Sequence, residues 1–245
     1  NIMRAQNFKE VVSALVGPTI QGIFFEGYSK KLWGIPTTKM SAKWAPKRIQ
    51  IREKHSSFWH NQFSAAGKYG SGAIMERMSE ETQNAGSKIN LNHEVKKFTT
   101  KDNKITKIHF SNGKEVDASN AIVISTIPLS HTSAMLGYKT NLQYNSYILV
   151  YVVVNQSEIL PKNAQSIYFA HDENYFHRVT EQKKYSDIGY PKNKTLLCFE
   201  VSYRTKPDLI KKNPEILCKE VFKQFCSLGF SKFERYEKGF TRAWP

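Results

Sequence analysis

Two large aromatic residues and two arginines lie within one short segment of the chain. Tyr28 and Trp33 come first, a Gly34-Ile-Pro36 turn follows, and Arg48 and Arg52 come last. Flat aromatic rings can stack on the ring of a ligand, and the arginine fork binds phosphate or carboxylate oxygens through two hydrogen bonds. The sequence therefore predicts a pocket for a small molecule that carries both a ring and an anionic group.

Positive charge is concentrated around this segment. The chain has a formal net charge of +15, and residues 28–54 hold eight lysines or arginines against one acidic residue, Glu53. Such a field attracts anionic ligands, although many of the lysines can simply be solvated on the surface. The alternative function is a basic, non-catalytic module that binds nucleic acid or an acidic partner. No aromatic sheet platform or helix-turn-helix motif supports that alternative.

The glycine spacing gives no phosphate-binding loop of the dinucleotide type. None of the 13 glycines forms a Gly-x-Gly-x-x-Gly motif. Gly67, Gly70 and Gly72 stand in a different order and follow a polar run instead of a strand. They are therefore a weak candidate for a phosphate loop.

The aromatic and arginine segment resembles a substrate-site motif of the flavin-dependent amine oxidase and protoporphyrinogen oxidase superfamily. The similarity is closest to the branch of UDP-galactopyranose mutase and related polysaccharide-biosynthesis flavoproteins. That branch has Tyr-Thr-x-Lys-x-Trp-Gly followed by Arg-x-Pro-x-Arg, where this chain has residues 28–34 and 48–52, with Ser29 for threonine and no proline between the arginines. The resemblance implies four substrate-binding residues: Tyr28, Trp33, Arg48 and Arg52.

A second block, between residues 67 and 129, resembles the same superfamily and implies the cofactor FAD. By this resemblance the backbone at Val95 meets the adenine end, and Thr126 and Pro128 lie near the dinucleotide. Because the chain lacks the glycine loop and begins at Asn1, we expect an internal or C-terminal part of a larger flavoenzyme, without its N-terminal Rossmann βαβ unit. By itself this part is not expected to retain FAD.

The resemblance implies one of two activities for the parent protein. It is an FAD-dependent, amine oxidase-like oxidoreductase, or it is a flavin-dependent mutase that rearranges a nucleotide-linked sugar. An anionic substrate of polysaccharide or lipopolysaccharide biosynthesis fits both activities. In either case the flavin does the chemistry and the protein orients the substrate, so no catalytic side chain is identified. A relative that has lost catalysis is a third interpretation, and the oligomeric state stays open.

Other chemistries have weak support. The seven histidines show no metal-ligand spacing with one another or with cysteine, so no metal site is predicted. No apolar run approaches the roughly 18 residues of a membrane span. The three cysteines, Cys198, Cys218 and Cys226, form no Cys-x-x-Cys pair, which favours a reducing cytoplasm.

Hydrophobic periodicity predicts a mixed α/β (α+β) fold with an antiparallel or mixed sheet and flanking helices. Helices are expected at residues 2–15, 19–31, 73–85 and 207–228, with a short helix from Ser41. Strands are expected at residues 89–95, 105–110, 115–117, 121–124, 147–154, 166–170, 175–180 and 195–203. We expect three parts: residues 1–66 as the helical part of a substrate domain, 67–137 as a helix and β-meander of the FAD domain, and 138–245 as a substrate-binding sheet with one long helix.

Overall fold

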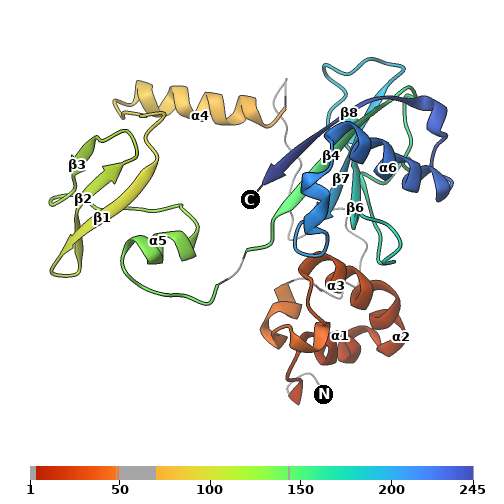
Figure 1. The fold of residues 1–245 in the computed structure, drawn as a ribbon, viewed down its shortest axis with the longest axis horizontal. Helices are drawn as coiled ribbons and strands as arrows, with labels where there is room; N and C mark the ends of the chain where they lie inside the picture. Colours follow the sequence, from red (N-terminus) through yellow and green to blue (C-terminus); the bar gives the residue numbers. More distant parts are fainter. Residues whose placement is uncertain (1–3, 48, 50–69, 143, 245) are drawn as a thin grey trace. The chain divides into compact units, whose positions relative to one another are not determined.

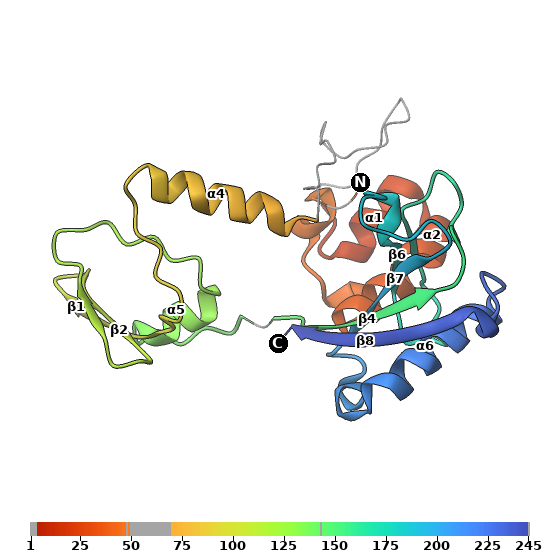
Figure 2. The same cartoon turned by 90° about the horizontal axis from the view of Figure 1, so that it is seen from above.

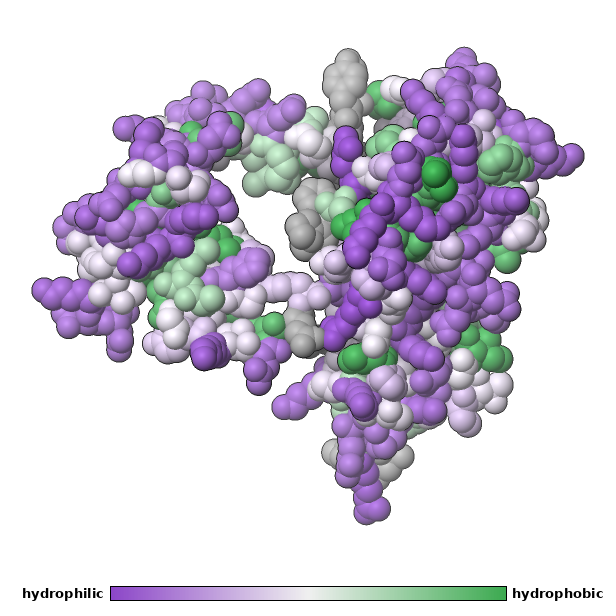
Figure 3. Space-filling model, in the orientation of Figure 1, coloured by the Kyte–Doolittle hydropathy of each residue, from purple (hydrophilic) through white to green (hydrophobic). Residues whose placement is uncertain are grey.

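The computed structural model describes residues 4–47, 49, 70–142 and 144–244. The chain divides into two compact units, which are described separately below (Figures 1 and 2). Unit 1 contains Asn1–Ile74 and Asn145–Pro245, and unit 2 contains Met75–Tyr144. The face of the molecule in Figure 3 is mostly hydrophilic, as the lysine-rich composition leads one to expect.

A five-stranded antiparallel sheet, in the order β5-β6-β7-β4-β8, forms the centre of unit 1. Its strands are β4 (Tyr147–Val154), β5 (Ser166–Tyr168), β6 (Arg178–Glu181), β7 (Thr195–Ser202) and β8 (Tyr236–Trp244). The apolar run that predicts the central strand β4 pairs with β7 on one side and with β8 on the other. The edge strand β8 was not predicted from the sequence.

One face of this sheet is covered by α6 (Pro214–Ser227) (Figure 2). Every second residue of β4 is fully buried in the core that the sheet forms with this helix. Gly239 permits the close approach, because a Cβ atom there would lie 2.5 Å from the Cβ of Cys218. The main core residues of the helix and of β4 are Leu217, Val221, Phe222, Phe225, Ile148, Val150, Val152 and Val154.

The N-terminal part of unit 1 is helical and has a small core of its own. Its elements are α1 (Phe8–Val16), α2 (Pro18–Ile20), the π-helix η2 (Gln21–Glu26), α3 (Gly27–Trp33) and the 3₁₀ helices η3 (Thr37–Lys39) and η4 (Ala42–Lys47). Asn7 caps α1 by accepting a hydrogen bond from the Glu10 amide. Phe8 and Val12 of α1 are buried against Met40 and Ala45.

Unit 2 contains a three-stranded antiparallel meander, β1 (Val95–Lys101), β2 (Lys104–Phe110) and β3 (Glu115–Asp117). Asp102 and Asn103 both adopt positive φ in the first turn, as a tight hairpin requires. The helix α5 (Leu129–Met135) packs against β1, and most of α4 (Gly72–Asn84) also belongs to this unit. Phe98 and Ala118 are its buried apolar residues among those described.

Two predicted strands of this unit differ from the structure. Residues 121–124, predicted as a buried strand, are not a strand, and Ile122 is 93% exposed. Apolar and β-branched residues favour a strand, but a strand also needs a neighbour to exchange hydrogen bonds, and no described segment pairs with this one. The strand predicted over 89–95 begins only at Val95, because Asn92 turns the chain with a φ of 58°.

Two predicted helices of unit 1 are interrupted. The helix expected over 207–228 is a 3₁₀ helix, η7 (Pro207–Lys211), followed by α6, because Asn213 caps a new helix that starts at Pro214. The helix expected over 19–31 changes to π geometry within η2 and then continues as α3. Among the described residues, every helix is too short or too polar to serve as a transmembrane span.

The C-terminal end of α3 is fastened to the sheet region by hydrogen bonds. The Leu32 carbonyl accepts hydrogen bonds from the Ser202 hydroxyl, at 3.0 Å, and from the Asn145 side-chain amide. The Lys31 carbonyl accepts one from the Thr205 hydroxyl at 3.2 Å. These bonds satisfy carbonyls that the end of a helix leaves without intrahelical partners. They also fix the rotation of α3 relative to the strands.

A buried lysine adds to this attachment. Lys31 is only 4% exposed and donates a hydrogen bond of 2.5 Å from Nζ to the carbonyl of His171. Burial lowers the pKa of this ammonium group to about 8, although the negative charge of Asp172 opposes the shift. The cation is tolerated because it donates to the His171 carbonyl and because Lys31 lies in the last turn of α3, the negative end of that helix.

We expect replacement of Lys31 by methionine to change how stability depends on pH. The pKa is about 8 in the folded protein against 10.5 in the reference state, so the unfolded chain binds more protons at this site between these values. Wild-type stability should therefore rise relative to Lys31→Met by on the order of 2 kcal/mol from about pH 7 to about pH 9.5. Urea unfolding at both pH values measures the difference.

The matched control is Lys39→Met, since Lys39 is an exposed lysine of the same helical part. Its stability difference from wild type should stay constant over the same pH interval. A constant difference for Lys31→Met as well would show that the buried ammonium group does not carry the predicted shift.

Candidate functional site

A pocket of about 600 Å³ lies in unit 1 between the helical part and the strands. Aromatic side chains from both parts make up most of its lining, and the polar members come chiefly from β6, β7 and the residue before β6. The lining residues are Phe8, Phe24, Phe25, Tyr28, Ser29, Leu32, Trp33, Trp44, Tyr147, Tyr168, His177, Arg178 and Glu200. An apolar pocket with a few convergent polar groups is the usual form of a small-molecule site.

The helix α3 contributes a stripe of side chains to this pocket. Tyr28, Ser29, Leu32 and Trp33 stand at positions i, i+1, i+4 and i+5, which share one helical face. The predicted stacking residues Tyr28 and Trp33 are thus brought together at one site. Gly34 ends the helix in the left-handed conformation, with its amide bonded 2.7 Å from the Lys30 carbonyl.

Edge-to-face contacts hold the aromatic walls in place. The ring of Tyr28 meets Tyr168 at a centroid distance of 5.3 Å and an interplanar angle of 82°. The rings of Trp33 and Trp44 meet at 5.4 Å and 89°. Such pairs contribute about 0.5–1.5 kcal/mol beyond their buried area. Burial raises the pKa of Tyr28, so its phenol stays neutral and can donate or accept a hydrogen bond at physiological pH.

The π-helix η2 brings Phe24 and Phe25 to the same lining. Its last residue, Glu26, accepts hydrogen bonds from the Gln21 amide at 2.9 Å and from the Thr37 hydroxyl. Burial acts to raise the pKa of Glu26, but the bonds from Thr37 and Gln21 outweigh it, and the pKa is lowered. The carboxylate therefore ties η2 to η3 while remaining charged.

Glu200 forms the polar centre of the pocket. It lies directly opposite Arg178 on neighbouring strands and accepts hydrogen bonds from Nε, at 2.9 Å, and Nη2 of that residue. Its other oxygen lies 3.4 Å from Nε2 of His177. Burial acts to raise the pKa of Glu200, but the interactions with the nearby His177 imidazole and with Arg178 outweigh it, so the pKa is lowered and the carboxylate is ionised.

His177 is a buried neutral group in this arrangement. Its side chain is 1% exposed, and burial lowers its pKa despite the nearby carboxylate. An imidazole with its proton on Nε2 would face Glu200 as a donor and leave Nδ1 as an acceptor. Among the described residues, neither ring nitrogen of His177 has a partner within hydrogen-bond geometry.

The structure does not test the roles of the other predicted site residues. Arg48 and Arg52 lie outside the described residues, so their role in binding stays a prediction. Val95, Thr126 and Pro128 all lie in unit 2, where Val95 begins β1 and the exposed Pro128 precedes α5. Their cofactor role also stays a prediction.

Sequence reasoning missed the polar part of the pocket. His177, Arg178 and Glu200 were not selected, although Glu200 interrupts an apolar run between Phe199 and Val201. A charged residue within a strand that is otherwise buried is a signal that could have identified it. Its partner Arg178 could not be identified in the same way, because the strand register is set by the whole sheet.

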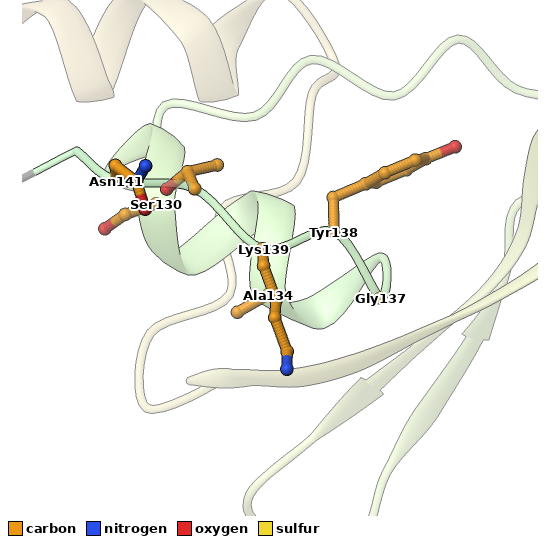
Figure 4. A pocket seen from close by; sticks show the side chains of 7 residues that line it. Ser130, Ala134, Gly137, Tyr138, Lys139 and Asn141 are labelled. Carbon is orange, nitrogen blue, oxygen red and sulfur yellow. The ribbon is translucent and has the colours of Figure 1, made fainter.

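A second, shallower hollow of about 510 Å³ lies in unit 2 around α5 (Figure 4). Ser130, Ala134, Gly137, Tyr138 and Lys139 contribute to it, and Figure 4 shows the side chains of Tyr138 and Lys139 pointing in different directions. Tyr138 is 66% exposed. This hollow lacks the converging polar groups of the first pocket. In the part of the chain that the structure describes, no cluster of three or more His, Cys, Asp or Glu could hold a metal ion.

Several solved structures share this fold. A reduced UDP-galactopyranose mutase is 21% identical, with a TM-score of 0.73 over 98% of this chain and 56% of that chain. A candidate protoporphyrinogen oxidase from Exiguobacterium sp. 255-15 is 14% identical, with a TM-score of 0.64 over 97% and 54%. An oxidoreductase from Methanosarcina mazei is 12% identical, with a TM-score of 0.61 over 98% and 56%.

The family model of UDP-galactopyranose mutase matches residues 23–214, which is more than half of the chain. The chain therefore belongs to the UDP-galactopyranose mutase family, and this confirms the resemblance and the mixed fold class predicted from the sequence. The chain spans a little over half the length of the solved proteins it matches. Among curated proteins, none matches it.

A substitution at Gly27 tests how closely α3 packs beside the pocket. A Cβ atom at this position would lie 2.3 Å from the carbonyl oxygen of Ala170, so α3 rests directly on the chain after β5. We expect Gly27→Ala to lower the free energy of unfolding by about 1–3 kcal/mol, because the helix must shift to relieve the overlap. Chemical denaturation measures this loss.

Gly22→Ala is the matched control, since nothing lies within 4 Å of a Cβ atom built there. Alanine is the better helix former, so this variant should be as stable as wild type or slightly more stable. Equal losses for Gly27→Ala and Gly22→Ala would contradict the close packing of α3.

Proposed function

We propose that the protein is a flavin-dependent enzyme that acts on a nucleotide-linked sugar, as a mutase-like member of its family. The observation that carries this proposal is the convergence of Tyr28 and Trp33 with Arg178 and Glu200 in one pocket, within the residues that match the family. The pocket offers aromatic faces for a ring and polar groups to orient it. The same site suits a substrate of polysaccharide or lipopolysaccharide biosynthesis.

The proposed roles follow from the side chains. Tyr28 and Trp33 stack on or flank the ring of the nucleotide or sugar. Arg48 and Arg52 bind the diphosphate, because each can give a phosphate oxygen charged hydrogen bonds that are worth about 1.5–3 kcal/mol. The substrate is thereby held by its ring and its anionic group, and the reacting sugar is presented to the cofactor.

FAD is the cofactor that we propose for the full-length protein. When bound, a flavin supplies the electron chemistry of either an oxidation or a sugar rearrangement. The described residues of unit 2 offer the irregular segment before Pro128, which includes Thr126, and the start of β1 at Val95. In this proposal both segments lie beside the bound dinucleotide. The sequence contains no Gly-x-Gly-x-x-Gly loop for the pyrophosphate.

The free cysteines support a cytoplasmic location as part of this proposal. Cys198, Cys218 and Cys226 form no disulfide, and burial raises the pKa of each thiol to about 11. Buried thiols with a raised pKa are unreactive and persist in a reducing compartment. No observation among the described residues favours the basic nucleic-acid-binding module.

The cofactor prediction is tested by the visible absorption spectrum of the full-length protein, purified without added flavin. We expect flavin bands between about 350 and 500 nm, either in the purified protein or after FAD is added. The reason is that proteins of this superfamily bind FAD as their cofactor. A colourless protein that also fails to take up FAD would contradict the flavoenzyme proposal.

The substrate prediction is tested by titrating the protein with UDP-galactose and measuring affinity by calorimetry. We expect Tyr28→Ala and Trp33→Ala each to weaken binding by about tenfold to a hundredfold, since stacking on a base contributes about 1–3 kcal/mol. Arg48→Ala and Arg52→Ala should weaken it by about one to two decades on the strength of charged hydrogen bonds.

Tyr185→Ala is the control, because this tyrosine is 47% exposed and does not line the pocket. Its affinity for UDP-galactose should equal that of wild type. Wild-type protein that fails to bind any nucleotide sugar would refute the proposed substrate class, and unchanged affinity in the two arginine variants would refute their role alone.

A further inference from the structure

Three polar side chains of the meander in unit 2 form a continuous chain of contacts. Oγ1 of Thr99 on β1 lies 2.7 Å from Nε2 of His109 on β2, and Nδ1 of His109 lies 2.8 Å from Oε1 of Glu115 on β3. The three strands lie side by side, so each contributes one member (Figure 1). A hydroxyl, an imidazole and a carboxylate in this order form an arrangement that can activate a nucleophile.

The strand register brings these residues together on one face. His109 lies opposite Glu115 on one side and opposite Lys97 on the other, and Thr99 follows two residues after Lys97. Successive side chains of a strand point to opposite faces, so Thr99 shares the face of Lys97 and lies diagonally across from His109. Phe98, between them in the sequence, is buried on the other face. Burial of that face therefore directs the polar group to the solvent.

The carboxylate determines the direction of the hydrogen bonds. Glu115 accepts a further hydrogen bond of 2.8 Å from Nζ of Lys107, which lowers the pKa of the carboxyl group, so the group is ionised and can only accept. In the neutral imidazole, Nδ1 of His109 must then carry the proton, which leaves Nε2 as the acceptor. The hydroxyl of Thr99 is therefore the donor, and its proton points to a base.

The hydroxyl is open to solvent and lies on a positively charged strand. Thr99 is exposed and the His109 side chain is 26% exposed, so a small electrophile can reach Oγ1 without a pocket. The strand β1 holds three lysines and no acidic residue. Positive charge attracts anionic reagents, and acyl phosphates are anionic acyl donors with a good leaving group.

We propose that Thr99 is a site of O-acylation by acyl phosphates, with His109 as the general base and Glu115 as the residue that positions it. Oγ1 of Thr99 attacks the carbonyl carbon of the acyl group while its proton passes to Nε2 of His109. The bond between that carbon and the phosphate oxygen breaks, and phosphate leaves with the electron pair. The imidazolium then returns the proton to phosphate or water. The product is an ester on Thr99, formed without oxidation or reduction and independently of any flavin chemistry.

The test is to incubate the full-length protein with acetyl phosphate and to map acetyl groups by peptide mass spectrometry, before and after treatment with alkaline hydroxylamine. Hydroxylamine cleaves esters but not the amides of acetylated lysines, so it distinguishes Thr99 from the lysines around it. Thr100 is the internal control, because it is also exposed and no described histidine bonds to its hydroxyl. We expect the initial rate of ester formation at Thr99 to exceed that at Thr100 by about a hundredfold, as a general base provides.

Substitutions of the three residues assign their roles. Thr99→Ser keeps the nucleophile and should still form the ester, whereas Thr99→Val should not. His109→Gln keeps hydrogen-bonding atoms but supplies no base, so the rate at Thr99 should fall about a hundredfold. Glu115→Gln should lower the rate at least about tenfold, because the amide N–H can hold the imidazole in the other tautomer. The ratio of the rates at Thr99 and Thr100 would not change if these residues had only a structural role.

Asp117→Asn is the matched control for the carboxylate, since Asp117 is on the same strand but bonds to Ser119 instead. Its rate at Thr99 should equal that of wild type, and an equal loss in Asp117→Asn and Glu115→Gln would contradict the positioning role. Thermal unfolding verifies that each variant is folded. Wild-type protein without a hydroxylamine-sensitive acetyl group on Thr99 would overturn the proposal. Equal rates at Thr99 and Thr100, or an unchanged rate in His109→Gln, would also overturn it.

Discussion

The attachment of α3 to the sheet region is the constraint on which the pocket depends. The carbonyls of Lys31 and Leu32 receive hydrogen bonds from Thr205 and Ser202, and Lys31 itself reaches the carbonyl of His171. These partners are more than 100 residues away in the sequence, so the bonds join two distant parts of unit 1. They fix the one helical face that carries Tyr28 and Trp33. Without them the aromatic stripe would have no defined distance from the polar groups on the strands.

The buried charges of unit 1 are compensated in two different ways. Lys31 lies away from the pocket lining and is compensated mainly by a carbonyl and the end of a helix, which is a structural use of a cation. Arg178 and Glu200 lie in the lining and compensate each other. Replacing a buried ion pair by apolar residues of similar volume is often neutral or stabilising, so stability alone gives little reason to keep one. Its position in the lining gives the pair a functional reason to persist.

The sequence pointed to two residues on the helical side of the pocket but to none of the polar residues on its sheet side. Tyr28 and Trp33 were selected from a family resemblance; both line the pocket, and their role in binding stays a prediction. Glu200 meets Arg178 only because β6 and β7 pair in one particular register, which local patterns cannot supply. Residues 121–124 show that a local pattern can also predict a strand that does not form. Their apolar, β-branched pattern is typical of a buried strand, yet hydrogen-bond partners decide whether a strand forms.

The pleat of the sheet links the core to the chemistry of the pocket. Val179 and Phe199 are fully buried in the core that includes α6, and the residues next to them in the sequence, Arg178 and Glu200, line the pocket. Successive residues of a strand point to opposite faces, so the packing that buries the first pair directs the second pair away from the core. A slip of one residue in β7 would bury the carboxylate and expose an apolar side chain to the ligand. The large cost of burying a charge in that core therefore protects the geometry of the pocket, and the ion pair is held in place by the hydrophobic core behind it.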